Sequence, residues 1–129
     1  SRFVSQYREH KGEIDLKKGA LFALVHGCRA LALEYGISAT NTSLRIKELN
    51  NVGFMDKETA TDLMEALEVL HTFRLHAQIE KSHKGSKIDN YISVEELSKL
   101  ERDLLKDALK SVDRFRKLVV HHFHLSIVG

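Results

Sequence analysis

Residues 56–83 read DKETATDLMEALEVLHTFRLHAQIEKSH, and the rest of the fold can be worked out from this stretch. Its apolar residues recur at steps of three and four, the spacing that places side chains on one face of an α-helix. They are Ala60, Leu63, Leu67, Leu70, Phe73 and Ala77. Asp56 can cap the first turn, and Gly85-Ser86 breaks the pattern. The stretch therefore predicts one long helix from Asp56 to about His83.

A second long helix is expected in the last third of the chain. Ser93-Val94-Glu95-Glu96 has the Ser-x-x-Glu form of a capping box. The apolar positions that follow are Leu97, Leu100, Leu104, Ala108, Val112, Phe115 and Val119. They predict a helix that opens at Ser93 and continues to about Phe123. At about 1.5 Å per residue, a helix of about 28 residues is roughly 40 Å long.

The stretch 15–35 predicts a third helix, which is apolar over more than one face and is expected at the centre of the bundle. Asp15 can cap its start, and Gly36 can take the left-handed conformation at its end. A connector over 37–42 then leads to a short helix. Thr42 or Ser43 is expected to cap that helix.

The short helix is expected to pack through three apolar residues and to end at Gly53. These residues are Leu44, Ile46 and Leu49. Residues Arg2 to His10 are expected to form a short helix or a lead-in. Proline is absent and no segment alternates with period two, so no sheet is predicted. The fold class is all-α: an elongated bundle of four to five helices, two of them long, in one domain over 1–129.

Composition excludes several classes of protein. The chain has 129 residues and a formal charge of +2, which gives no electrostatic case for a nucleic-acid partner or a membrane surface. No apolar stretch is long enough to span a membrane. Cys28 is the only cysteine and lies in an apolar run, so a buried thiol and a cytoplasmic location are expected. The chain begins at Ser1, and we expect a C-terminal fragment of a larger multidomain protein.

Catalytic and metal-binding motifs are scarce. The chain has no Gly-rich phosphate loop, no Gly-x-Ser-x-Gly and no His-Glu-x-x-His. His121 and His124 could share a helix face, but no local cysteine or carboxylate completes a metal site, so none is predicted. Arg116 precedes His121 by five positions, a spacing found in HEPN ribonucleases. A HEPN-like ribonuclease therefore stays open as an alternative.

Several basic residues interrupt apolar patterns. Arg29 lies within an apolar helix, where a charge needs a partner or a ligand. Arginine can grip a phosphate or carboxylate with two parallel hydrogen bonds. Arg102 and Lys106 have acidic neighbours, so surface ion pairs explain them better.

Several segments together resemble a known family. They are Ile14-Asp15-Leu16-Lys17, Leu31-Ala32-Leu33-Glu34-Tyr35-Gly36-Ile37, Thr40-Asn41-Thr42 with Arg45, Phe73-Arg74-Leu75-His76-Ala77-Gln78, Asn90-Tyr91-Ile92, and the stretch 97–106. In this order they resemble the nucleotidyltransferase substrate-binding domain known as DUF294, C-terminal part. The resemblance implies a domain that follows a catalytic nucleotidyltransferase domain, often with CBS and cyclic-nucleotide-binding-like domains upstream, in a signal-transduction protein.

The resemblance also implies roles for residues. The family's polar pattern falls on Asp15, Lys17, Arg29, Thr42, Arg45, Arg74, His76, Gln78, Asn90 and Arg102. We expect a substrate- or nucleotide-binding set of Lys17, Arg29, Thr42, Arg45, Arg74 and His76. No catalytic residue and no cofactor is expected here, because Mg²⁺ belongs to the catalytic domain of the parent protein.

Partners follow from the same resemblance. They are the catalytic domain of the same chain and a nucleotide or an acidic protein substrate. The main alternative is a helical module for protein interaction or dimerisation, which would make a homodimer and expose an apolar patch beyond the core. Arg74 and His76 could instead be structural.

Overall fold

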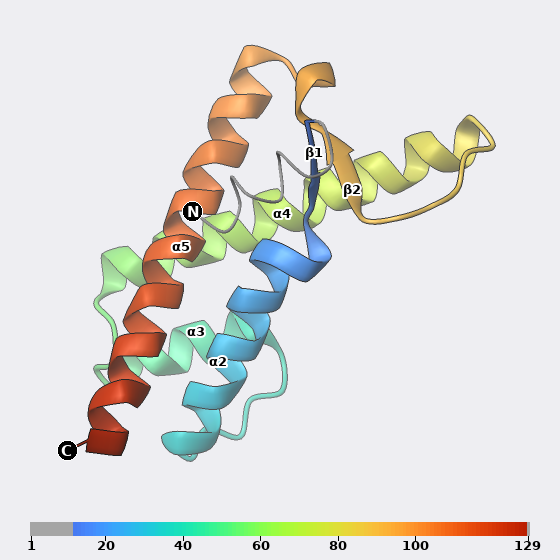
Figure 1. Cartoon of the computed structure of the whole chain (residues 1–129). Helices are drawn as coiled ribbons and strands as arrows, with labels where there is room; N and C mark the ends of the chain where they lie inside the picture. The colour runs from blue at the N-terminus through green and yellow to red at the C-terminus, as the bar shows by residue number, and fades with distance from the viewer. Residues whose placement is uncertain (1–11, 129) are drawn as a thin grey trace.

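The computed structural model describes the backbone of residues 12–128 and the side chains of residues 12–125. Four α-helices lie in this part of the chain: α2 (Phe22–Glu34), α3 (Thr42–Asn51), α4 (Lys57–His83) and α5 (Lys99–Val128). The long helices α4 and α5 cross each other, α2 runs along the second half of α5, and α3 packs on α2 and α4 (Figure 1). The predicted all-α bundle with two long helices is confirmed. The lead-in predicted over 2–10 lies outside the described residues.

Local chemistry sets the ends of α4 as predicted. The Asp56 carboxylate accepts a hydrogen bond from the Thr59 N–H at 2.8 Å and caps the first turn. The helix ends at His83, and Gly85 follows with φ of +69°, a conformation that glycine adopts without steric cost. No helix in the described part of the chain is apolar over a membrane-spanning length.

The central helix begins later than predicted: α2 starts at Phe22, and Asp15, the expected first residue, is the last residue of the strand β1 (Glu13–Asp15). Asp15, with only 3% of its surface exposed, accepts a hydrogen bond from the Lys18 N–H at 2.9 Å. A π-helical turn, η1 (Lys17–Leu21), leads from this cap into α2. Gly36 ends the helix with φ of +67°. The buried carboxylate is thus held at the positive end of the helix.

The predicted cap of α3 is wrong by one residue. Asn41, not Thr42 or Ser43, accepts the Leu44 N–H, at 2.8 Å. Asparagine is as good a cap as serine or threonine, and Asn41 has the extended backbone that a cap requires. The short helix packs through Ile46 and Leu49, whereas half of Leu44 stays exposed.

The predicted start of the last helix is also wrong. α5 begins at Lys99, and its capping box is Ser98 with Glu101: each backbone N–H of the pair donates to the side chain of the other. Ser93 instead ends a strand and is followed by a short 3₁₀ turn, η2 (Val94–Glu96). Residues 93–96 and 98–101 both have the Ser-x-x-Glu form. Ser93 pairs in the sheet, so the helix begins after Ser98.

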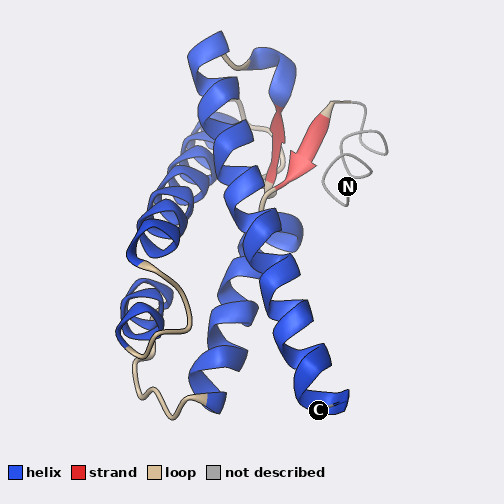
Figure 2. Ribbon diagram, turned by 90° about the vertical axis from the view of Figure 1, so that its left-hand side faces the viewer, coloured by secondary structure: helices blue, strands red, loops and turns tan. Residues whose placement is uncertain are grey.

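A two-stranded antiparallel sheet contradicts the prediction of no sheet. β1 (Glu13–Asp15) pairs with β2 (Tyr91–Ser93), and Ile14 lies opposite Ile92 (Figure 2). Strands of three residues are too short to show alternation, and their partners lie far apart in sequence. The sheet fastens the start of the central helix to the loop that follows α4.

The core lies where the four helices meet. Its largest fully buried side chains are Phe115, Leu16, Leu24, Leu31, Ile46, Leu49, Leu63, Leu70 and Val112. Gly27 brings α2 close to α5, because a Cβ atom at this position would lie 2.8 Å from the Phe115 ring. A larger residue at position 27 would therefore push α2 and α5 apart.

Candidate functional site

The structure places the six predicted site residues in three regions. Arg29 is on α2 and Thr42 and Arg45 are on α3, Arg74 and His76 are on α4, and Lys17 opens η1. We name the first three the α2–α3 site.

Arg45 is the central residue of the α2–α3 site. Its side chain is half-buried, and its Nε donates to the Ala39 carbonyl oxygen at 2.9 Å. No carboxylate in the described part of the chain forms an ion pair with it, although Glu48 lies one turn further along α3. The Glu48 carboxylate instead accepts a hydrogen bond from Asn51. The terminal amino groups of Arg45 therefore remain available for an anion.

Cys28 lies on α2, the helix on which α3 packs. Burial raises the pKa of the Cys28 thiol to about 12, and the Arg45 guanidinium offsets this only in part. The thiol is fully buried, as predicted, and is protonated at neutral pH. This electrostatic effect of Arg45 agrees with the packing of α3 on α2.

Arg29 and Thr42 are the other two residues of the α2–α3 site. Arg29 follows Cys28 directly and is exposed on α2, with no ion pair to any described residue. Thr42 is half-buried in the first turn of α3, one turn before Arg45. Free N–H groups at a helix start favour anions. Arg45 and the start of α3 are thus available for a phosphate or carboxylate, and Arg29 adds a cationic group on the neighbouring helix α2.

Arg74 lies in a different setting, the α4–β2 cluster, which we define as Arg74, Gln78 and Asn90. Arg74 Nε and Gln78 Nε2 both donate to the Asn90 side-chain oxygen, at 2.7 and 3.1 Å. The Asn90 backbone oxygen accepts the Leu16 N–H at 3.0 Å. The cluster therefore joins α4, the start of β2 and the start of the central helix.

A lysine anchors the same loop. Lys81 Nζ donates to Asp89 and, at 2.6 Å, to the Tyr91 carbonyl oxygen. The hydrogen bond from Lys81 holds the pKa of the Asp89 carboxyl below its ordinary value of 3.8. Sequence reasoning assigned Gln78 and Asn90 to the family pattern but not to the binding set, and it did not single out Lys81.

His76 and Lys17 join neither group. Both side chains are exposed. His76 is two residues from Arg74, about 200° around the helix, so the two side chains diverge. Its electrostatic effect on Glu101 places it near the start of α5.

The C-terminal half of α5 carries a contact that the sequence did not reveal. His122 hydrogen-bonds to Glu34 at 2.5 Å, across 88 positions of sequence. Its ring also packs on Tyr35 and Phe54, with centroid distances of 6.1 and 5.2 Å. These contacts hold α5 to the end of α2.

The pair expected of a HEPN-like ribonuclease has other surroundings. Arg116 binds Asp113 at 3.2 Å, and His121 is exposed. The described residues contain no group of three or more side chains able to hold a metal ion. Arg116 thus forms its ion pair within its own helix.

The protein is a helical bundle in which a short sheet ties the central helix to the loop before α5. The chain belongs to the family described as "Putative nucleotidyltransferase substrate binding domain", a model of which matches residues 1–123. The resemblance seen in the sequence is confirmed, and the domain is of a nucleotidyltransferase-associated kind. No curated protein and no solved structure matched the chain.

Proposed function

We propose that this chain is the non-catalytic, substrate-positioning domain of a nucleotidyltransferase and that the α2–α3 site holds an anionic group of the substrate. The observation that carries the proposal is Arg45. It is a half-buried guanidinium without a carboxylate partner among the described residues, and its amino groups have no hydrogen-bond acceptor there. Burying part of a charge is costly unless a counter-charge arrives, and a ligand can supply it.

The chemistry suits a phosphate. The two amino groups of a guanidinium match two phosphate oxygens, and Arg29 and the α3 start add positive potential. Such groups act by holding the substrate in place and by stabilising charge, not by making bonds. The catalytic carboxylates and their Mg²⁺ belong, in this proposal, to the catalytic domain of the parent protein. An acidic protein substrate would use the same groups.

The wider setting is part of the same proposal. The catalytic domain of the same chain, the CBS and cyclic-nucleotide-binding-like domains upstream, a role in signal transduction and a cytoplasmic location come from the family resemblance alone. They stay predictions.

Calorimetric titration with ATP and then UTP, with and without Mg²⁺, tests the proposal. We expect saturable binding that is lost in Arg45→Ala and weakened in Arg29→Ala. Lys47→Ala is the matched control, since Lys47 lies on the same helix, is exposed, and its loss changes net charge equally. Unchanged binding in Arg45→Ala, or an equal loss in Lys47→Ala, would contradict the proposed site. The absence of saturable binding would remove the nucleotide from the proposal, and titration with an acidic peptide would then decide on the protein substrate.

A further inference from the structure

A row of leucines on α5 is left uncovered by the bundle. The residues are Leu100, Leu104, Leu118 and Leu125, which are 70%, 43%, 40% and 52% exposed. Ser111 falls midway between Leu104 and Leu118, so the row keeps a step of seven from residue 104 to residue 125. A seven-residue repeat keeps side chains on one helix face, and it is the spacing by which helices pair. We name this face the α5 stripe; it is roughly 38 Å long from residue 100 to residue 125.

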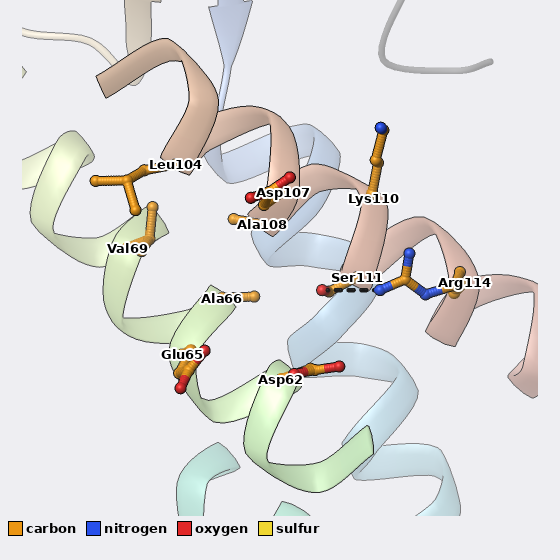
Figure 3. Close-up of a pocket in the computed structure, with 10 residues that line it drawn as sticks. All are labelled: Asp62, Glu65, Ala66, Val69, Leu104, Asp107, Ala108, Lys110, Ser111 and Arg114. Carbon is orange, nitrogen blue, oxygen red and sulfur yellow. Dashed lines mark hydrogen bonds between the residues drawn. The ribbon is translucent and has the colours of Figure 1, made fainter. Parts of the chain in front are cut away.

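The middle of the stripe is hollow and charged. An open hollow of about 320 Å³ lies between α4 and α5, with the small residues Ala66, Ala108 and Ser111 at its centre (Figure 3). Asp107 and Arg114 line it on either side of Ser111 along α5. Small residues at the centre allow another helix to approach closely.

We propose that a second copy of this chain covers the α5 stripe, with the two α5 helices antiparallel about a two-fold axis near Ser111. Leu104 lies seven residues before Ser111, and Leu118 lies seven after it. Reversing the helix about Ser111 therefore sets Leu104 against Leu118 of the partner subunit. An interface of this symmetry uses the same surface on both copies.

The charges select the same arrangement. Asp107 lies four residues before Ser111 and Arg114 lies three after it. In the antiparallel pair, Asp107 lies within one residue of the position opposite Arg114 of the partner subunit. The two-fold axis forms this pairing twice. A parallel pair would instead set each charge against its own copy, and like charges in contact repel. Asp62 and Glu65 of α4 border the same hollow and add negative potential for the partner's Arg114.

The first test is the molar mass of the chain by sedimentation equilibrium over roughly two decades of concentration. We expect reversible dimerisation, and we expect Leu104→Glu and Leu118→Glu each to weaken it at least about tenfold. Leu33→Glu is the matched control, because Leu33 is 76% exposed and belongs to α2, not to the α5 stripe. A strict monomer at every concentration overturns the proposal. So does a dimer that only Leu33→Glu disrupts.

Charge reversal tests the register without adding or removing apolar surface. Asp107→Arg alone and Arg114→Asp alone should each weaken the dimer, and the two together should restore it, since opposite charges face each other again. Failure of the double variant to recover overturns the antiparallel arrangement. Ser111→Cys should form a disulfide-linked dimer under mild oxidation, while the buried Cys28 stays unreacted. If the stripe is covered by another domain of the parent protein, none of these variants will change the mass of the chain. None of this depends on the proposed substrate role.

Discussion

Replacing Arg74 by alanine should destabilise the fold without affecting the α2–α3 site. The variant loses the hydrogen bond from the guanidinium to Asn90, which spans 2.7 Å. A hydrogen bond that involves a charged group contributes about 1.5–3 kcal/mol, and since Arg74 is only half-buried we expect about 1–2 kcal/mol. With a urea dependence of about 1–3 kcal/mol per molar, the unfolding midpoint should fall by roughly 0.3–2 M. Circular dichroism at increasing urea measures it.

Asn90 and Arg45 provide the comparison. Asn90→Ala removes the acceptor shared by two donors and should lower the midpoint at least as far, whereas Asn90→Asp keeps an acceptor and should not. Arg45→Ala loses one hydrogen bond to a backbone carbonyl and should cost less than about 1 kcal/mol. Arg102→Ala, an exposed arginine, serves as the control. An Arg74→Ala variant that unfolds with the wild type and yet binds no nucleotide would refute this division between a structural and a binding arginine.

Three further outcomes are expected. In urea unfolding, Gly27→Ala should destabilise the chain by about 0–2 kcal/mol, because overpacking against Phe115 outweighs a helix-propensity gain of about 1 kcal/mol. In a Phe115→Leu background the same change should stabilise the chain. Equal effects in both backgrounds would contradict the close approach. Cys28 should resist thiol reagents at pH 8 until urea unfolds the chain, because its pKa is raised to about 12; rapid labelling of the native chain would contradict its burial. Hydrogen bonds from the side chain and backbone of Thr59 hold the pKa of Asp56 below its ordinary value of 3.8, and those from the backbone and side chain of Ser98 hold the pKa of Glu101 below 4.5. The unfolded chain therefore binds more protons, and stability present at neutral pH should fall as the pH drops below about 4. Glu101→Gln should flatten that fall in acid titrations followed by circular dichroism.

Features set by neighbouring residues could be predicted from the sequence. The ends of α4 and the cap at Asp15 depend on side chains within a turn of the atoms they bind. The predicted cap of α3 was wrong because adjacent residues have the same capping chemistry: Asn41, Thr42 and Ser43 can all cap a helix. The wrong start of α5 has the same cause, since two Ser-x-x-Glu segments lie in succession and local chemistry does not rank them.

Features set by distant residues could not be predicted. The strand pair sets Ile14 against Ile92, and the contact of His122 with Glu34 joins the last helix to the end of α2. Three-residue strands and single polar contacts leave no periodicity in the sequence. The same limit applies to the binding set: spacing alone could not place Arg74 beside Asn90, or His76 on another side of α4.

One physical criterion separates the basic residues of this domain. An arginine that builds the fold gives its hydrogen bonds to a side chain whose position other contacts fix, as Arg74 does with Asn90. One suited to a ligand is partly desolvated but keeps its terminal amino groups open, as Arg45 does. Sequence places both residues in one family pattern, although their surroundings in the structure differ. Stability and binding measurements on the same variants are therefore needed together, since either alone would assign the two arginines the same role.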